Sequence, residues 1–523
     1  MKSPRNTILR LAALTAFAIL SVSSYCWAQE TSGNPQTSNA VRDLEEQVRQ
    51  LRSLVDEMRT ENQQSRAEMR QLRSDLESTR ALLQQSAGND TVARSASQNA
   101  APPATSSAAP PPSSLEERVQ KLEDASSLMG SKVDEQYQTK VETASKYRAR
   151  LHGIVLMNAF RNVGKSDDLD FPSYAEAVHF GNPRANVGAT LRQSEIGLEV
   201  FGPNVAGART TADIQFDFAG GFPATGNGVN FGIMRMQTAS LHLDWDHTSV
   251  IAGQDSLFIS PLSPTSFSSL ATPALAFAGN LWGWTPQLRL EHRFTLSDEQ
   301  TITMQAGVLD NLTWEPPYDP FYRTSQAGEL SGQPAYAFRA AWSRPLKEHP
   351  LSFGAAGYYG RQNWTWNRNV DAWAGMADWQ VPIAPRLTLS GEFYRGRGIG
   401  GLGAAVGTSV VYGANPMYAT SPLRGVDTAG GWAQLKLQLT PKVELNGVLS
   451  QDDAFTGNIR GFATDQNNFG EVIGRNRGAL GNIVFRPRSD LVLSAELKRL
   501  RTFPVYSSST SLNQVNLSMG ILF

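Results

Sequence analysis

Apolar residues between positions 41 and 86 recur at alternating steps of three and four residues, which is the seven-residue repeat of a coiled coil. The repeat continues over six heptads, and it predicts a rod about 70 Å long at 1.5 Å per residue. Asn62 occupies a core position, where a buried amide commonly fixes register and strand number, so the segment predicts oligomerisation. The predicted core residues are Val41, Leu44, Val48, Leu51, Val55, Met58, Asn62, Met69, Leu72 and Leu76.

An amphipathic helix that packs on its own protein is the alternative interpretation of residues 41–86. Charged residues outside the seam leave only a narrow apolar stripe, which favours the coiled coil. The seam does not decide between two and three strands, because Val at the first core position, Leu at the second and a core Asn are all compatible with a dimer.

From residue 147 to residue 523 the apolar period changes to two. In the clearest case Ile196, Leu198 and Val200 alternate with Glu195 and Glu199. Such alternation predicts strands that turn one face toward an apolar medium and the other toward polar surroundings. The same pattern recurs at residues 213–218, 288–291, 435–439 and 491–497.

The connections between these strands also alternate in length. Seven short turns, such as those at 246–248 and 440–441, separate eight generally longer connections, which predicts sixteen strands. An even count, with short turns on one rim and long loops on the other, is typical of a bacterial outer-membrane barrel. The longer connections are expected at residues 162–183, 220–232, 255–285, 310–334, 361–368, 396–428, 452–476 and 503–509.

A soluble all-β sandwich or solenoid is the alternative fold, but it would expose its polar face to water and carry more charge. Aromatic residues expected on the outward face near the short turns favour the barrel instead, because they form an interfacial girdle. A closed barrel also leaves no sheet edge in lipid. The expected girdle is Tyr147, Trp245, Phe294, Trp342, Trp379, Phe485 and Phe523.

Three further segments precede the strands. Residues 1–28 resemble a secretory signal peptide, with Lys2, Arg5 and Arg10 before an apolar stretch and Ala28 at the expected cleavage site. Removal of this segment would leave no cysteine, because the only one is Cys26. Residues 87–114 are rich in Ala, Ser and Pro and predict a linker, and residues 115–146 predict a second, shorter helix.

Composition excludes two classes of protein. Charged residues make up 18% of the 523 residues, below the ~25% of soluble domains, yet no apolar run is long enough for a membrane-spanning helix. The formal net charge of −1 lacks the basic excess of a nucleic-acid-binding protein, so no nucleic-acid partner is expected.

Three motifs suggest chemistry but lack the context for it. Residues 398–403 match the glycine pattern of dinucleotide sites, but they fall in a long loop without a βαβ unit. The six histidines show no metal-ligand spacing. Ser240 and His242 share a strand face, a spacing that chance often supplies. We therefore expect no enzyme activity, no cofactor and no metal.

The last thirteen residues alternate and end on Phe523, which looks like the assembly signal of Gram-negative outer-membrane barrels. The larger layout resembles the DcaP-like trimeric porins: a coiled coil, a linker, the opening strand at 151–160, the motif at 192–197, the segment 252–254 before a long third loop, and the segment 286–289. The sequence departs from lysine-lined phosphate-selective porins, because its barrel region holds only Lys165, Lys347, Lys436, Lys442 and Lys498.

The resemblance implies an outer-membrane porin for passive diffusion of small polar or anionic solutes. Its partners would be the lipid bilayer and two further copies in a homotrimer, with the N-terminal rod in the periplasm and in possible contact with the cell wall. An envelope tether or adhesin-type barrel, which the coiled coil supports best, is the alternative function.

The candidate site residues follow from strand faces and from the apolar third loop. The loop is expected to fold inward and narrow the pore, or else to pack on a neighbouring subunit, with Asp255, Phe258, Phe267, Phe277 and Trp282 as its candidates. The expected pore lining is Glu195, Glu199, Asp213, Asp217, Asp244, Arg289, Glu291, Arg293, Arg339, Glu392, Lys436, Glu444, Arg486, Glu496 and Lys498.

Overall fold

The computed structural model describes most of the chain from residue 148 onward. The segments predicted at 1–28, 41–86, 87–114 and 115–146, and Tyr147, lie outside the described residues. The described ranges are 148–178, 181, 183–222, 232–297, 299–315, 323–346, 349–468 and 470–523.

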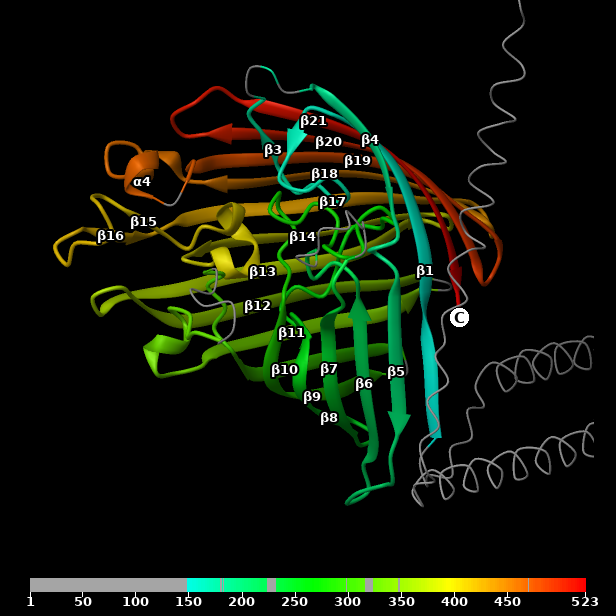
Figure 1. Ribbon diagram of the computed structural model, residues 1–523. Helices are drawn as coiled ribbons and strands as arrows, with labels where there is room; N and C mark the ends of the chain where they lie inside the picture. The colour runs from blue at the N-terminus through cyan, green and yellow to red at the C-terminus, as the bar shows by residue number, and fades with distance from the viewer. Residues whose placement is uncertain are drawn as a thin grey trace, which may run out of the picture. The chain divides into compact units, whose positions relative to one another are not determined.

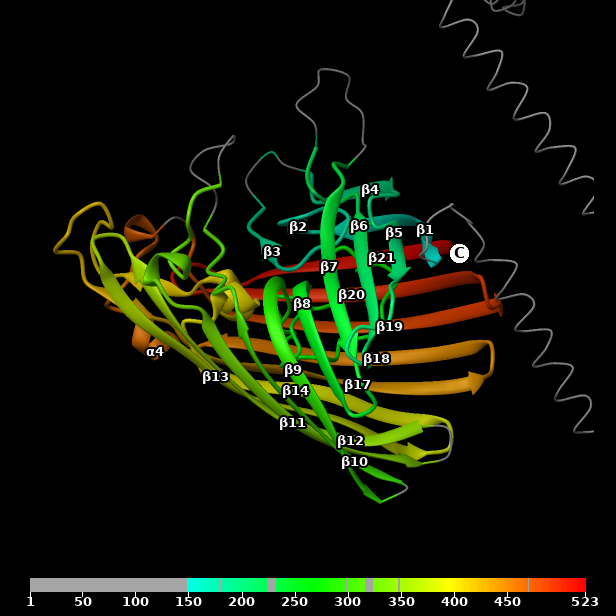
Figure 2. The same cartoon turned by 90° about the horizontal axis from the view of Figure 1, so that it is seen from below.

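Antiparallel strands form one closed sheet around a lumen (Figures 1 and 2). β1 pairs with β21 on one side and with β4 and β5 on the other, which closes the ring. β4 and β5 follow each other along β1 and form one interrupted strand, so the ring has sixteen strands and the predicted number is confirmed. The strands are β1 (Arg148–Val163), β4 (Ala185–Thr190), β5 (Glu195–Phe201), β6 (Arg209–Asp217), β7 (Arg235–Asp244), β8 (Thr248–Ser256), β9 (Trp284–Ser297), β10 (Gln300–Leu309), β11 (Ala335–Leu346), β12 (His349–Trp364), β13 (Arg368–Ala384), β14 (Leu387–Arg397), β17 (Asp427–Thr440), β18 (Val443–Ala454), β19 (Ile473–Arg488), β20 (Leu491–Pro504) and β21 (Thr510–Leu522).

The predicted alternation of short and long connections is present in most of the ring. The connection between β20 and β21, expected to be long, is only 505–509 and is shorter than the turn 202–208 between β5 and β6. The connection expected at 361–368 is only the turn 365–367, because β12 and β13 continue to Trp364 and from Arg368. Trp366 and Asn367 have positive φ values of 66° and 57°, which lets the chain reverse in three residues. Large side chains in the left-handed region are uncommon, so the tight turn left no recognisable signal in the sequence.

The long connections contain only short elements, among them β2 (Lys165–Ser166), β3 (Ala175–Glu176), β15 (Val410–Tyr412), β16 (Leu423–Gly425) and α4 (Thr456–Ile459). Within the described ranges, no helix has the length and apolar character needed to cross a membrane.

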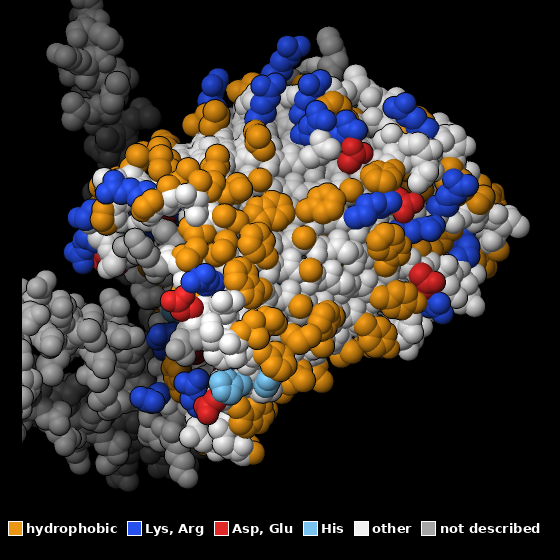
Figure 3. Space-filling model, turned by 180° about the vertical axis from the view of Figure 1, so that it is seen from behind, with side chains coloured by type: hydrophobic (Ala, Val, Ile, Leu, Met, Phe, Trp, Pro, Cys, Tyr) orange, Lys and Arg blue, Asp and Glu red, His pale blue; other side chains and the backbone are white. Residues whose placement is uncertain are grey.

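The two faces of the barrel wall differ in polarity, as β21 illustrates. Leu517 and Met519 point outward and are 59% and 53% exposed, whereas Gln514 and Asn516 point inward and are buried. An apolar band covers much of the outer wall in the space-filling view (Figure 3). Since exposed apolar surface on this scale is unfavourable in water, the outer wall is suited to a lipid environment.

Several members of the aromatic girdle expected from the sequence lie where the described strands approach the short turns. Phe294, Phe485 and Phe523 are exposed on the outer wall, and Trp342 stacks on Phe353 with ring centroids 6.3 Å apart. The backbone of Phe523 exchanges two hydrogen bonds with Gly153 of β1, at 3.0 and 3.1 Å. The last residue of the chain therefore contributes to closing the ring.

A charge placed on the outer wall tests its environment. Leu290 lies in the middle of β9 and is 51% exposed, so Leu290→Arg is expected to lower the free energy of unfolding in bilayers by about 2–4 kcal/mol. The control is Leu346→Arg at the short-turn end of β11, where the expected loss is only about 0–1 kcal/mol. Urea unfolding in lipid vesicles measures both, and equal effects would show that the wall does not face hydrocarbon.

Candidate functional site: the lumen and its inward loop

The third long connection, residues 257–283, crosses the lumen. It connects β8 and β9, the fifth and sixth strands of the ring. It extends to β14, β17 and β20, which are the eleventh, twelfth and fifteenth strands. On β14, Glu392 accepts hydrogen bonds from Ser260 Oγ at 2.5 Å and from the Leu262 amide at 2.8 Å. The predicted inward loop is therefore held against the wall opposite its origin.

Further anchors continue along the loop. On β17, Gln434 Oε1 accepts a hydrogen bond from the Thr265 amide at 2.7 Å. On β20, Glu496 accepts from the hydroxyls of Ser266 and Ser268, and Lys498 Nζ donates to Ser269 Oγ at 2.5 Å. Residues 257–283 contain no charged side chain. The wall supplies the charges, and the serines and threonines of the loop satisfy them.

An apolar cluster fixes the middle of the loop. Ala274, Leu275 and Ala278 are buried against side chains from the inner wall, among them Trp432 and Leu480. Gly279 has a φ of 116°, and a Cβ there would lie 2.3 Å from the carbonyl oxygen of Gly431 on β17. Only glycine permits this close approach of the loop backbone to the wall.

The loop is also held at the interruption between β4 and β5. Gln193 Nε2 donates to the Ser268 carbonyl at 3.0 Å, and Gln193 Oε1 accepts from the Leu270 amide at 2.8 Å. Arg235 on β7 donates to the Ala271 carbonyl and pairs with the buried Asp217, both at 2.5 Å. The loop therefore has contacts on both sides of the lumen.

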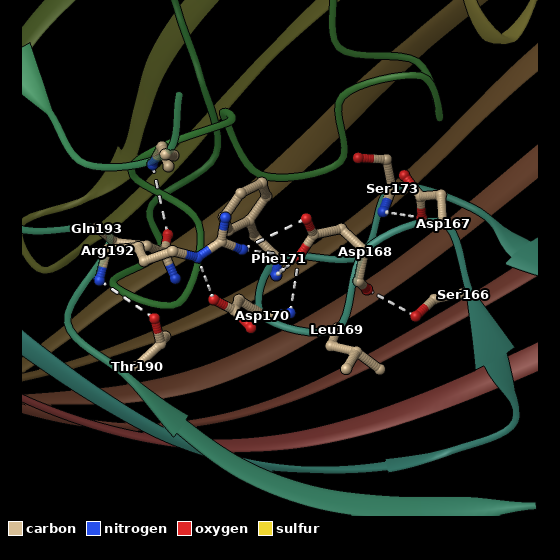
Figure 4. Close-up of polar contacts among 12 residues, drawn as sticks. Ser166, Asp167, Asp168, Leu169, Asp170, Phe171, Ser173, Thr190, Arg192 and Gln193 are labelled. Carbon is tan, nitrogen blue, oxygen red and sulfur yellow. Dashed lines mark hydrogen bonds and ion pairs between the residues drawn. The ribbon is translucent and has the colours of Figure 1, made fainter. Parts of the chain in front are cut away.

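The first long connection also folds inward, beside Gln193 (Figure 4). The guanidinium of Arg192 lies between Asp170, with an Nε–Oδ2 distance of 2.8 Å, and Asp168, at 3.5 Å. Its charge also lies over the ring of Phe171 at 5.1 Å. Arg192 is buried, so these contacts hold residues 168–171 against the interior rather than leaving a free charge.

Aromatic rings gather where loops from the long-loop rim meet. Trp282 contacts Phe277, Trp284 and Trp314 edge to face, with centroids 5.0–5.8 Å apart. The Trp282 amide donates to the carbonyl of Leu402, which belongs to the connection between β14 and β15. Two further long connections therefore touch the crossing loop at this point.

Asp310, at the end of β10, lies 3.6 Å from the exposed guanidinium of Arg323, which also pairs with Glu329. The pKa of Asp310 is raised, mainly by partial burial. The neighbouring carboxylate of Glu329 raises it further, and Arg323 partly opposes both effects.

The expected pore-lining residues all lie on inward strand faces, but their surroundings differ. Glu392, Glu496 and Lys498 are buried beneath the crossing loop, and Asp217 is buried beside Arg235. Arg339 is buried in a pair with Asp378, at 2.7 Å. These five residues hold parts of the structure together, whereas the remaining candidates are less covered.

Most of the remaining carboxylates contact a basic side chain. Glu199 pairs with Arg150, Asp213 with His152, and Glu291 with Arg293, at 2.5, 3.0 and 2.7 Å. Asp255 pairs with Arg289 at 3.0 Å, and Glu444 lies 3.5 Å from Lys436 and 3.6 Å from Arg486. Asp244 has no hydrogen-bond or ion-pair partner among the described residues. The inner wall therefore presents charges of both signs side by side.

Sequence reasoning missed Arg150, His152, Arg192, Gln193, Arg235 and Asp378. Their roles depend on which residues face each other across strands, and strand register was not known from the sequence. The alternation that placed Glu195 inward would have placed Arg235 and Asp378 inward as well.

Ser240 and His242 are hydrogen-bonded, with 2.9 Å between Oγ and Nε2. No carboxylate among the described residues bonds to His242, so the pair lacks the third group that would orient the imidazole. No cluster of three metal-ligating side chains occurs in the described part of the chain.

No protein-family model and no curated protein is significantly similar to this chain. Among solved structures, the outer membrane channel DcaP of Acinetobacter baumannii aligns with a TM-score of 0.55 at 14% identity, covering 74% of this chain and 100% of that chain. An anion-selective porin from Comamonas acidovorans aligns with a TM-score of 0.43 at 12% identity, covering 72% of this chain and 100% of that chain. OprB of Pseudomonas putida aligns with a TM-score of 0.43 at 12% identity, covering 76% of this chain and 97% of that chain. The first likeness confirms the predicted resemblance at the level of the fold, and the other two scores are too low to carry an argument.

Removal of the wall carboxylates tests how the loop is held. Glu392→Ala combined with Glu496→Ala leaves buried loop hydroxyls without their acceptors. Each unpaired group is expected to destabilise the folded loop by roughly 1–3 kcal/mol. We expect chymotrypsin to cut residues 257–283 in this variant, whereas the wild-type loop resists. Glu444→Ala is the control, because Glu444 contacts Lys436, Arg486 and Asn446 but not the loop. Equal resistance of all three proteins would mean that the other contacts of the loop, among them those with Gln193, Gln434 and the apolar cluster, hold it without the two carboxylates.

Proposed function

We propose that this protein is an outer-membrane channel through which small polar or anionic solutes diffuse passively. The observation that carries the proposal is a closed ring of sixteen strands with an apolar outer wall and a polar inner wall. Barrels of this size enclose more space than wall side chains can fill, and an inward loop then sets the width of the path.

The distribution of charge supports a channel of mixed character. The crossing loop has no charged residue, so it repels neither cations nor anions. Carboxylates of the wall from which the loop arises, such as Asp255 and Glu291, are paired with Arg289 and Arg293. A wall of paired charges attracts polar solutes without excluding one sign. The preference for anionic solutes rests on the sequence resemblance.

We further propose a homotrimer whose N-terminal rods extend into the periplasm. An even strand number places both ends of a barrel on one side, and the short-turn rim of outer-membrane barrels is periplasmic. Three neighbouring barrels would bring three rods together and raise their effective concentration for pairing. The tether or adhesin function remains the alternative, because a rod can also contact the cell wall.

Conductance in planar bilayers tests the channel. Wild-type protein is expected to conduct, and deletion of residues 263–276 is expected to increase the single-channel conductance. The Glu392→Ala/Glu496→Ala variant keeps the loop but loosens it, and should raise the conductance or its noise. An unchanged conductance in the deletion would show that the loop does not limit the path.

Two further results of the same measurement decide between functions. A folded protein that never conducts would favour the tether or a plugged barrel. Reversal potentials across a salt gradient give the ion selectivity, and a strong preference for cations would contradict anionic solutes.

Native mass measurement tests the assembly. We expect the full mature chain to be a trimer, and we compare it with a chain that begins near Leu115. A monomeric full-length protein would reject the trimer. A trimer that survives the deletion would mean that the barrel wall drives assembly and that the rod is a spacer.

A further inference from the structure

Five arginines project from the outer wall near the long-loop ends of β19, β20 and β1, with β21 between the last two. They are defined here as the arginine patch: Arg161 on β1, Arg475 and Arg477 on β19, and Arg499 and Arg501 on β20. Their neighbours along the strands, such as Asn476 and Leu500, are buried on the inner side. Figure 3 shows Lys and Arg side chains bordering the apolar band of the outer wall.

The strand register brings these cations together. Arg477 lies directly opposite Arg501 in the β19–β20 pair. Arg499 pairs with Asn513 of β21, which in turn pairs with Val163 of β1, two residues from Arg161. Like charges directly opposite each other destabilise a sheet. Such an arrangement is favourable where an anion binds between the cations.

Aromatic and polar contacts hold three of the guanidinium groups in place. Those of Arg475, Arg477 and Arg501 lie 6.0, 5.5 and 4.8 Å from the ring centroid of Phe503. Arg475 pairs with Asp453 at 2.7 Å, and Arg477 donates to Gln451 Oε1 at 2.7 Å. These contacts restrict the side chains before any ligand arrives, which lowers the entropic cost of binding.

The positive charge of the patch is mostly uncompensated. Within the described ranges Asp453 is the only carboxylate that pairs with any of the five arginines. The side chains of Arg161 and Arg499 have no hydrogen-bond or ion-pair partner within the described ranges, and both residues are exposed. Glu471 precedes β19 and accepts a hydrogen bond from the Ser507 hydroxyl rather than from an arginine of the patch.

An apolar depression lies on the same strands, on the short-turn side of the patch. It has a volume of about 450 Å³ and is lined by Met157, Ala159, Ile483, Leu493, Ala495 and Leu517, among others. Ala159 is two residues from Arg161, and Ala495 is four residues from Arg499, so both belong to the same outward faces. The small side chains of Ala159 and Ala495 between larger ones create the hollow.

We infer that the arginine patch and the depression together bind a phosphorylated lipid of the outer leaflet. Guanidinium groups donate paired hydrogen bonds to phosphate oxygens, and an acyl chain fits the apolar hollow beside them. The inference rests on the proposed outer-membrane location, because the long-loop rim then lies at the level of the outer-leaflet head groups. Charge complementarity favours such a lipid over a second copy of this chain.

Lipid binding by the full mature protein tests the inference. The probes are a bisphosphorylated lipid A and its dephosphorylated form, added to the detergent-purified protein and quantified by native mass spectrometry. The test variant carries Arg477→Gln, Arg499→Gln and Arg501→Gln. Each arginine near an anionic lipid head group contributes roughly fivefold in affinity, so we expect binding of the phosphorylated lipid to fall on the order of a hundredfold.

The matched control removes three arginines at the opposite rim, the half-buried Arg344 and the exposed Arg386 and Arg488, each by substitution with Gln. It should bind within about twofold of wild type. The dephosphorylated lipid should bind wild type as weakly as the phosphorylated lipid binds the test variant. Filling the hollow with Ala495→Trp should also weaken binding. If the triple variant does not fold, Arg499→Gln alone should lose roughly fivefold.

Three results would overturn the inference: a test variant that binds within twofold of wild type, equal binding of both lipid forms, or a test variant that loses only its oligomeric state. The last result would assign the face to contacts between copies of the chain. Conductance of the same preparations separates this inference from the proposed function. Wild type that binds lipid but does not conduct would reject the channel alone, and a conducting protein without phosphate-dependent binding would reject the lipid site alone.

Discussion

Closure of the sheet is the constraint on which the other features depend. In an apolar medium an unpaired backbone edge is unfavourable, and the ring removes both edges by pairing β1 with β21 and with β4 and β5. The terminal backbone of Phe523 completes this seam at Gly153. Once the ring is closed, the alternation along every strand assigns each side chain either to the lumen or to the outer wall.

That assignment explains why the charged residues have such different roles. Inward carboxylates such as Glu392 and Glu496 meet an uncharged loop whose hydroxyls and amides satisfy them, so charge on the wall becomes the anchor of the loop. Inward carboxylates beyond the loop, such as Asp255 and Glu444, are paired across neighbouring strands with Arg289 and Lys436. The same physical requirement, that a charge inside a low-dielectric wall needs a partner, produces both results.

Sequence periodicity was sufficient to predict the barrel, its sixteen strands and the inward faces of residues such as Glu195 and Arg289. It could not separate residues that face open lumen from those buried by the loop, because Glu496 and Glu444 have the same alternation and differ only in what covers them. The pairing of Arg339 with Asp378 depends on strands two positions apart in the ring. Tight turns with unusual residues, such as Trp366 and Asn367, were equally hidden.

The charges of the outer wall also need partners, but these come from the surroundings of the protein. Arg477 and Arg501 face each other on adjacent strands, and among the described residues only Asp453 pairs with any of the five arginines of the arginine patch. On the inner wall the crossing loop and paired residues compensate most of the charges of the described residues. On the outer wall compensation is left to the surroundings, and at the long-loop rim of an outer-membrane barrel the surrounding anions are lipid phosphates. The contrast between a balanced interior and an unbalanced exterior is what makes the patch a binding surface rather than a structural contact.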